Sequence, residues 1–229
     1  MIRPNFTKDH DLTSSGAQAP IIEAPINKAP FILASASPRR LDLLAQIGLR
    51  PDAIDAPQVD ETARPHELPA AYARRIAGDK LAAVAARHPG AYVLAADTVV
   101  ALGRRILPKA EDSATARRCL ELLSGRRHKV VGGIAIAAAD GRQAIRVVST
   151  NVIFKRLEKS EIEHYLAGGE WHGKAGGYAI QGRAEAFVRL LAGSHSAVIG
   201  LPLYETVHLL EGAGYPVFHS WMTAPQSEV

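Results

Sequence analysis

Cysteine is nearly absent from this chain, since Cys119 is the only one among its 229 residues. A disulfide framework and a cysteine-based metal site are therefore excluded within one chain, and a reducing compartment is favoured. Long hydrophobic runs are missing too, because no window reaches the roughly 18 apolar residues of a membrane-spanning helix. The first 30 residues lack the apolar core of a signal peptide. We therefore expect a cytoplasmic protein that has no membrane partner.

Aromatic residues make up only 6% of the chain, which leaves few side chains to stack on nucleic-acid bases. The formal net charge of +4 is small, and arginines occur as scattered pairs rather than as one basic run. These features predict no nucleic-acid partner. A basic pocket for a small acidic ligand explains the charge at least as well as a nucleic-acid face does.

Several common site motifs are also missing from the sequence. The histidines form no H-x-x-x-H or HExxH pattern, and neither a G-x-x-x-x-G-K-[ST] loop nor a G-x-S-x-G turn occurs. A zinc site of the usual spacing is therefore not expected. Any metal should be a hard, oxygen-bound divalent cation, Mg²⁺ or Mn²⁺.

The composition supports one large folded unit, because 47% of the residues are hydrophobic and 22% are charged. Residues 1–30 contain several prolines around a Ser-Ser-Gly stretch, which is typical of a weakly ordered extension. We expect the folded domain to span 31–214 and a C-terminal tail to span 215–229.

Strand-like and helix-like patterns alternate along the first half of the chain, and two long strand runs then follow each other around an Asp-Gly turn. Ser160 and Glu163 have the spacing of a capping box. The expected strands are 31–34, 52–56, 92–100, 128–138, 144–155, 186–191 and 195–199, and the expected helices are 38–47, 67–87, 112–123, 160–167 and 202–211. This order predicts an α/β fold with a mixed, partly parallel central sheet flanked by helices.

Two arginines stand where a helix should favour acids. After a short buried strand, Ser37 is a good N-cap and Pro38 suits the first helical position, so Arg39 and Arg40 fall in the first turn. That turn has unpaired N–H groups and a partial positive charge. A bound anion, in particular a phosphate chain, would relieve the conflict, with Ser35 adding a hydroxyl. The alternative is a pair of solvated surface arginines.

Acidic residues near this segment are candidates for catalysis and for metal binding. Asp97 ends the most hydrophobic part of a strand, where it can act as a general base toward water or help to hold a divalent cation. Glu61 follows Asp60 in a proline-rich loop, and paired acids beside phosphates can recruit a cation. The alternatives are a turn-forming aspartate and solvated loop acids.

Basic and amide side chains complete the candidate set. Lys80 lies within a predicted helix, and Lys109 follows a proline in a loop, so both are candidates for phosphate contact although either can be simply solvated. Gln181 belongs to a glycine-rich segment, 170–183, where the backbone can approach a ligand closely. Its amide offers one donor and one acceptor, which matches uracil or thymine, whereas a carboxylate would suit guanine better. A loop without a ligand is the alternative.

Taken together, these segments resemble the Maf family of nucleoside triphosphate pyrophosphatases over residues 31–212. Besides Lys80 in its helix, the matching segments are LASASPRR at 33–40, VDET at 59–62, ADTVV at 96–100, SGRRHKV at 124–130, KAGGYAIQG at 174–182 and GLPL at 200–203. The resemblance implies a fold like that of inosine triphosphatase, with two lobes around a cleft, and it raises a homodimer as the assembly to expect.

The resemblance also implies hydrolysis between the α and β phosphates of a nucleotide, giving a monophosphate and pyrophosphate with Mg²⁺ or Mn²⁺. Asp97 matches the proton acceptor, and Glu61 with Asp97 would hold the metal. Ser35, Arg39, Arg40, Glu61, Lys80 and Lys109 match positions that hold phosphates and their metal, and Arg39, Thr98 and Gln181 match positions of base choice. Lys174 with Gln181 looks like the branch acting on dTTP and UTP. The alternative function is a nucleotide-sensing regulator of cell division, or septum formation, without significant turnover.

Overall fold

The computed structural model describes residues 29–219 and residue 221. Most of the predicted extension at 1–30 and the last part of the predicted tail therefore lie outside the described residues. Tyr215 and Val217, which the sequence analysis assigned to the tail, are buried against the first strand and the last helix of the fold. The packed part of the chain thus continues beyond residue 214.

The elements follow each other in the alternating order predicted for the first half of the chain. The strands are Phe31–Ala34 (β1), Ala53–Ile54 (β2), Tyr92–Leu102 (β3), Arg105–Leu107 (β4), Lys109–Ala110 (β5), Arg127–Ala137 (β6), Gln143–Phe154 (β7), Lys174–Ala175 (β8) and Val188–Ala192 (β9). The helices are Pro38–Gln46 (α1), Pro69–Ala85 (α2), Ser113–Leu123 (α3), Lys159–Ala167 (α4), Arg183–Phe187 (η1, a 3₁₀ helix), His195–Ile199 (α5) and Leu203–Gly212 (α6).

A seven-stranded mixed sheet forms the centre, with the order β2-β1-β3-β6-β7-β9 and β4 paired to the far part of β3. The β1–β2 and β1–β3 pairs are parallel, whereas β3–β6, β6–β7 and β7–β9 are antiparallel. The prediction of a partly parallel sheet flanked by helices is confirmed. A second, two-stranded sheet joins β5 to β8.

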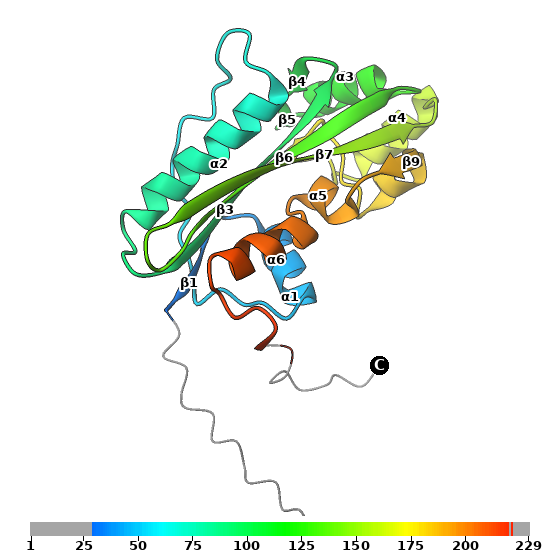
Figure 1. The fold of residues 1–229 in the computed structure, drawn as a ribbon. Coiled ribbons are helices and arrows are strands. Elements are labelled where there is room, and N and C mark those ends of the chain that lie inside the picture. The colour runs from blue at the N-terminus through cyan, green and yellow to red at the C-terminus, as the bar shows by residue number, and fades with distance from the viewer. Residues whose placement is uncertain (1–28, 220, 222–229) are drawn as a thin grey trace, which may run out of the picture.

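Helices cover both faces of the first half of this sheet, with α2 on one side and α1 and α6 on the other (Figure 1). Alternate residues of β1 follow this arrangement, since Phe31 packs toward α1 and α6 while Ile32 packs toward α2. The α2 backbone approaches β6 so closely that a Cβ atom on Gly133 would lie 2.0 Å from the Ala73 carbonyl oxygen. Only glycine fits at that position.

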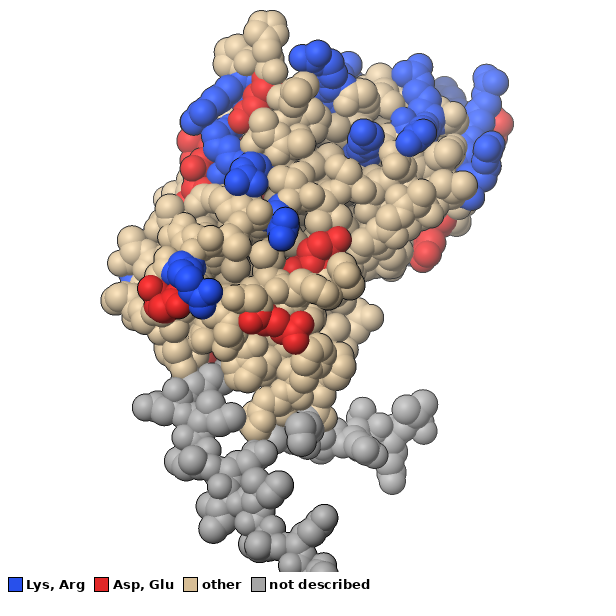
Figure 2. All heavy atoms as spheres, viewed as in Figure 1, with Lys and Arg blue, Asp and Glu red and all other residues tan. Residues whose placement is uncertain are grey.

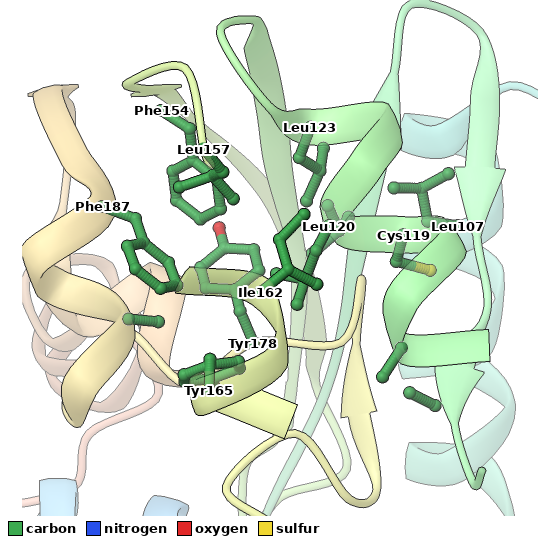
Figure 3. Packing of buried hydrophobic residues seen from close by; sticks show 14 of the residues in the cluster. Leu107, Cys119, Leu120, Leu123, Phe154, Leu157, Ile162, Tyr165, Tyr178 and Phe187 are labelled. Atoms are coloured by element: carbon green, nitrogen blue, oxygen red, sulfur yellow. The ribbon is translucent and has the colours of Figure 1, made fainter. Parts of the chain in front are cut away.

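A second core lies beside the distal ends of β3, β6 and β7, where α3 and α4 pack together (Figure 3). Tyr178 reaches into this core from the glycine-rich segment and packs edge-on against Phe154. Its other labelled members are Leu107, Cys119, Leu120, Leu123, Leu157, Ile162, Tyr165 and Phe187. The four buried clusters of the described residues thus fall into two groups, which we call the two cores: the clusters around α1, α2 and α6 form the first, and the cluster beside α3 and α4 forms the second. The site described below lies between them.

Two local predictions were wrong. The segment 195–199 is helix α5 rather than a strand, because the Ser194 side chain accepts a hydrogen bond from the Ala197 N–H and caps the turn. The capping box of α4 is formed by Glu158 and Glu161 rather than by Ser160 and Glu163. Glu158 replaces the usual serine or threonine, so the standard pattern pointed two residues too far along the chain.

Charged side chains of both signs occupy the surface, and in the view of Figure 2 the lysines and arginines form separate groups. Acidic residues lie among some of them, as in the bidentate pair between Arg87 and Asp55. None of the helices in the described part of the chain combines the length and the hydropathy that a membrane-spanning segment requires.

Candidate functional site

A polar pocket opens between the two cores and collects side chains from both. The first core contributes the start of α1, one residue of α2 and the middle of β3, and the second contributes β5, β8 and the segment after β8. Its lining includes Ser37, Arg39, Arg40, Lys80, Asp97, Thr98, Lys109, Lys174, Tyr178, Gln181 and Gly200. An adjoining pocket shares Asp97, Thr98 and Lys109 and adds Glu61. All the predicted site residues except Ser35 therefore line this one region.

The two arginines of α1 have different environments. Arg40 is buried, and its Nη1 donates to the Ser35 hydroxyl at 2.6 Å while its Nε donates to the Gly200 carbonyl at 2.9 Å. Its Nη2 lies 3.5 Å from the Thr98 hydroxyl. Burial lowers the pKa of Arg40, and the nearby charge of Asp97 opposes this effect. Arg40 thus ties α1 to β3 and to the α5–α6 turn.

The Arg39 side chain lines the pocket and forms no ion pair or hydrogen bond among the described residues. Burial lowers its pKa. Ser37 takes the N-cap position but makes no side-chain capping bond, and Pro38 occupies the first helical position. The start of α1 therefore presents one arginine with free side-chain donors to the pocket. Its backbone offers little more, because Ser37 N–H donates to the Ser35 hydroxyl at 3.3 Å, Arg40 N–H donates to the Ser37 carbonyl at 3.2 Å, and proline has no N–H.

Gly200 sets the geometry of the turn that Arg40 contacts. Its φ of 147° lies in a region that side chains rarely adopt. The Gly200 carbonyl accepts from both Arg40 and the Thr98 hydroxyl, the latter at 3.3 Å. In the sequence this glycine is part of the GLPL segment, and its positive φ has no separate signal there.

Asp97 lies in the middle of β3, inside the predicted strand 92–100, and is therefore not the turn-forming aspartate of the alternative interpretation. The parallel pairing of β3 with β1 ends at Ala95, and β3 then continues alongside β6, with β4 joining it only from Val100 onward. Asp97 therefore stands just beyond the carboxyl end of β1, where the chain turns toward α1. Its carboxylate is 5% exposed and lies 2.9 Å from the Lys80 ammonium.

Glu61 extends this ion pair into a chain of alternating charges. Its Oε1 lies 2.7 Å from Lys80 Nζ, and its Oε2 lies 2.7 Å from Lys109 Nζ. Partial burial would raise the pKa of Glu61, but hydrogen bonds from Lys109 and Lys80 outweigh it and lower the pKa to about 2. Glu61 is therefore ionised at neutral pH.

These two carboxylates also fit a divalent cation. Because the single Lys80 ammonium lies within 2.9 Å of an oxygen of each, Asp97 and Glu61 reach one common cationic position. Carboxylate oxygens are the ligands preferred by Mg²⁺ and Mn²⁺. Within the described part of the chain, no group of three or more His, Cys, Asp or Glu side chains is arranged to hold a metal.

The segment after β8 supplies the far wall of the pocket. Gln181 is exposed at the pocket rim, and among the described residues no hydrogen bond occupies its amide. Lys174 donates to the His172 carbonyl at 3.0 Å, and burial followed by repulsion from Arg39 lowers its pKa. Arg39 and Lys174 thus place positive charge on facing walls of the pocket.

Several residues that hold the site in place were not singled out from the sequence. The Tyr178 hydroxyl lies 2.9 Å from Nε2 of buried His128, and the Tyr165 hydroxyl accepts from the Ala179 N–H at 3.0 Å. Tyr72 donates to the Glu61 carbonyl at 2.7 Å. The spacing of eight residues between Tyr72 and Lys80 on one helix face was the signal available for Tyr72.

Comparison with known proteins gives consistent matches over the folded region. The family model described as "Maf-like protein" matches residues 30–213. The "dTTP/UTP pyrophosphatase" of Rhodospirillum rubrum is 65% identical over 189 residues, covering 82% of this chain and 90% of that protein. The protein of the same name from Paramagnetospirillum magneticum is 63% identical over 187 residues, covering 82% of this chain and 98% of that protein. The one from Caulobacter vibrioides is 59% identical over 185 residues, covering 81% and 96%.

A solved structure is a more distant match. The nucleoside-triphosphatase, or dITP/XTP pyrophosphatase, of Mycobacterium abscessus is 17% identical with a TM-score of 0.34. The match covers 56% of this chain and 75% of that one.

Proposed function

This chain belongs to the Maf-like protein family, and on that premise we propose that it hydrolyses the α–β phosphoanhydride of nucleoside triphosphates, releasing a monophosphate and pyrophosphate. The observation that carries the proposal is the convergence of Asp97, Glu61, Lys80 and Lys109 at one pocket that also receives Arg39. A buried carboxylate next to several cationic groups suits attack on a polyanion by water.

Asp97 is the general base in this proposal. Its carboxylate accepts a proton from water as the water oxygen forms a bond to the α phosphorus. The bond from that phosphorus to the bridging oxygen breaks, and pyrophosphate leaves with the electron pair. Lys80 keeps the Asp97 oxygen in place through the 2.9 Å contact and adds positive charge beside the phosphates.

The phosphates would be held by the basic wall of the pocket. Arg39 has free donors for a bidentate contact, and Lys109 is half-exposed next to Glu61. Arg40 can contribute mainly through charge, because Nε and Nη1 already donate to protein oxygens. Ser35 is buried and accepts from both Arg40 and the Ser37 N–H, so it would serve the phosphates by holding the Arg40 guanidinium, with its own hydroxyl hydrogen as a further donor.

Glu61 and Asp97 would bind a divalent cation, Mg²⁺ or Mn²⁺, together with phosphate oxygens of the substrate. When bound, the cation would neutralise part of the phosphate charge and polarise the reacting phosphoryl group. Lys80 contacts Asp97 through Oδ1, and among the described residues no hydrogen bond occupies the other carboxylate oxygen, so that oxygen stays available to a cation beside Glu61.

The substrate we propose is dTTP or UTP, or a modified pyrimidine nucleotide. Gln181 would pair its amide with the N3–H and one carbonyl of the base, and Thr98 and Arg39 would contact the nucleotide nearby. The relatives at 59–65% identity are named dTTP/UTP pyrophosphatases. A location in the cytoplasm and a homodimeric assembly are part of the same proposal.

One assay tests the activity and its main alternative. Pyrophosphate release is measured from dTTP, UTP, dCTP, CTP, dATP, ATP, dGTP and GTP, each with Mg²⁺ and with Mn²⁺. We expect turnover with the thymine and uracil nucleotides at kcat/KM at least about tenfold above the others, corresponding to about 1.4 kcal/mol of discrimination. Nucleotide binding without turnover under every condition would instead favour a sensor that regulates cell division.

A further inference from the structure

The segment 55–68, which carries Glu61, has no helix or strand of its own. It connects β2 to α2, and its fourteen positions make it long for a connection inside a compact domain. A carboxylate on such a segment keeps a fixed position only if specific contacts hold the backbone on both sides of it. Side chains of α2 supply such contacts at Glu61 itself and at the residues that follow it.

Arg75 makes the most extensive of these contacts. Its Nε donates to Glu67 Oε1 at 2.7 Å and its Nη2 donates to Glu67 Oε2 at 2.7 Å. Nη2 also donates to the backbone carbonyl of Thr62, the residue after Glu61, at 3.0 Å. The planar guanidinium therefore joins the end of the segment to the residue next to Glu61.

Tyr72 holds the backbone of Glu61 itself. Its hydroxyl donates to the Glu61 carbonyl oxygen at 2.7 Å, and its ring is buried. The Arg75 guanidinium carbon lies 5.5 Å from the centre of that ring, so Arg75 packs against the side chain that holds Glu61. Both anchors lie on α2, the helix that also carries Lys80.

We infer that Arg75 is a positioning residue that fixes Glu61 beside Lys80 and Lys109 by anchoring the backbone of residues 62–67 to α2. The side chain of Arg75 touches neither Asp97 nor the central pocket, so it acts only through Glu61. The expected effect of Arg75 on the reaction rate rests on the proposed function. Its expected effect on the backbone of residues 62–67 rests on the contacts alone.

Arg74 provides a matched control, because it is the preceding arginine of the same helix and is exposed, with no contact to the segment among the described residues. Arg75→Ala should lower kcat/KM for dTTP by about tenfold to a hundredfold, since displacing Glu61 by about 1 Å loses that much. It should also raise the Mg²⁺ concentration needed for half-maximal rate. Arg74→Ala should change neither.

A double-mutant cycle separates positioning from general stability. In a Glu61→Gln background, Arg75→Ala should lower kcat/KM by less than about twofold further, because both changes disable the same carboxylate. If Arg75→Ala lowers kcat/KM in the Glu61→Gln background by as much as it does in the wild type, Arg75 does not act through Glu61. If the alanine variant fails to fold, Arg75→Lys serves instead, because lysine keeps the charge and loses the bidentate geometry.

Amide hydrogen exchange tests the anchor without any turnover. Exchange at residues 60–67 should be faster in Arg75→Ala than in Arg74→Ala or wild type, while exchange in β3 stays unchanged. Equal exchange in both variants would overturn the inference. A wild-type protein that releases no pyrophosphate would overturn the proposed function, and the exchange result would still decide whether Arg75 anchors the segment.

Discussion

Replacement of Asp97 by asparagine removes one negative charge from the most buried acidic position of the site. The amide oxygen of the new side chain can still accept from Lys80, which at present donates to the carboxylate at 2.9 Å. Glu61 remains 2.7 Å from the same ammonium, so Lys80 keeps one anionic partner. We therefore expect a loss of stability of at most about 1.5–3 kcal/mol, the size of one charge-assisted hydrogen bond.

The loss of activity should be larger than the loss of stability. An amide cannot accept the proton of the attacking water, and general-base catalysis contributes about 10²–10⁴-fold. At about 1.4 kcal/mol per factor of ten, this loss is about 3–5.5 kcal/mol of transition-state stabilisation. The decrease should appear in kcat for pyrophosphate release from dTTP at saturating Mg²⁺, with a smaller change in KM.

Asp42→Asn is the control, because Asp42 is an exposed carboxylate on α1 and should lose no activity when neutralised. Asp97→Glu keeps the charge but moves the carboxylate by one methylene, so kcat should fall about a hundredfold because the base is misplaced. If Asp97→Asn is folded by thermal unfolding and retains kcat within about threefold of wild type, water activation by Asp97 is refuted.

Three further predictions follow from contacts in the same region. Arg40→Ala should lower the free energy of unfolding, measured with urea, by about 2–4 kcal/mol, because buried oxygens lose a charged donor. Arg39→Ala should change that free energy by less than about 0.5 kcal/mol and should raise KM for the nucleotide. Equal effects of the two substitutions on stability and kinetics would show that the two arginines are equivalent. Burial lowers the pKa of His128 from 6.5 to about 4. The unfolded chain therefore binds a proton that the folded protein excludes, so stability should fall as pH drops from 6.5 toward 4 by up to about 3 kcal/mol, and urea titrations of His128→Gln should lack this part of the slope. Gln181→Glu should lower kcat/KM for dTTP by about tenfold to a hundredfold and raise the relative rate with guanine nucleotides; an unchanged substrate profile would remove Gln181 from base recognition.

The local chemistry of the sequence was sufficient to predict most of the elements. The Asp-Gly turn at 140–141 gives the β6–β7 hairpin, and the proline at position 38 marks the start of α1. Periodicity failed at 195–199, where five residues are too few to distinguish a strand from a single helical turn. There the deciding contact is made by one side chain, Ser194, and a five-residue hydrophobic pattern does not contain it.

The candidate residues were found from residue type and resemblance, but the different contacts that each side chain makes were not predictable. Arg39 and Arg40 are adjacent and identical, and only the folded chain shows that Gly200 and Ser35 occupy the second of them. Gly200 lies 160 positions away from Arg40, so no local pattern links the two. The sequence does not predict the contacts that hold Glu61 either, because they depend on how a loop folds back onto α2.

The different environments of the two arginines also change how the start of α1 is understood. Two positive charges in a first helical turn should destabilise it, but Arg40 is buried among protein oxygens and near the carboxylate of Asp97. Lys80 and Lys109 pair with the site carboxylates, whereas among the described residues Arg39 and Lys174 form no ion pair, and burial lowers the pKa of each. A triphosphate placed between them would supply the missing counter-charge, so nucleotide binding should stabilise the protein. Thermal unfolding with a non-hydrolysable dTTP analogue should show an increase in Tm that is reduced in Arg39→Ala, and an equal increase in both proteins would exclude Arg39 from phosphate binding.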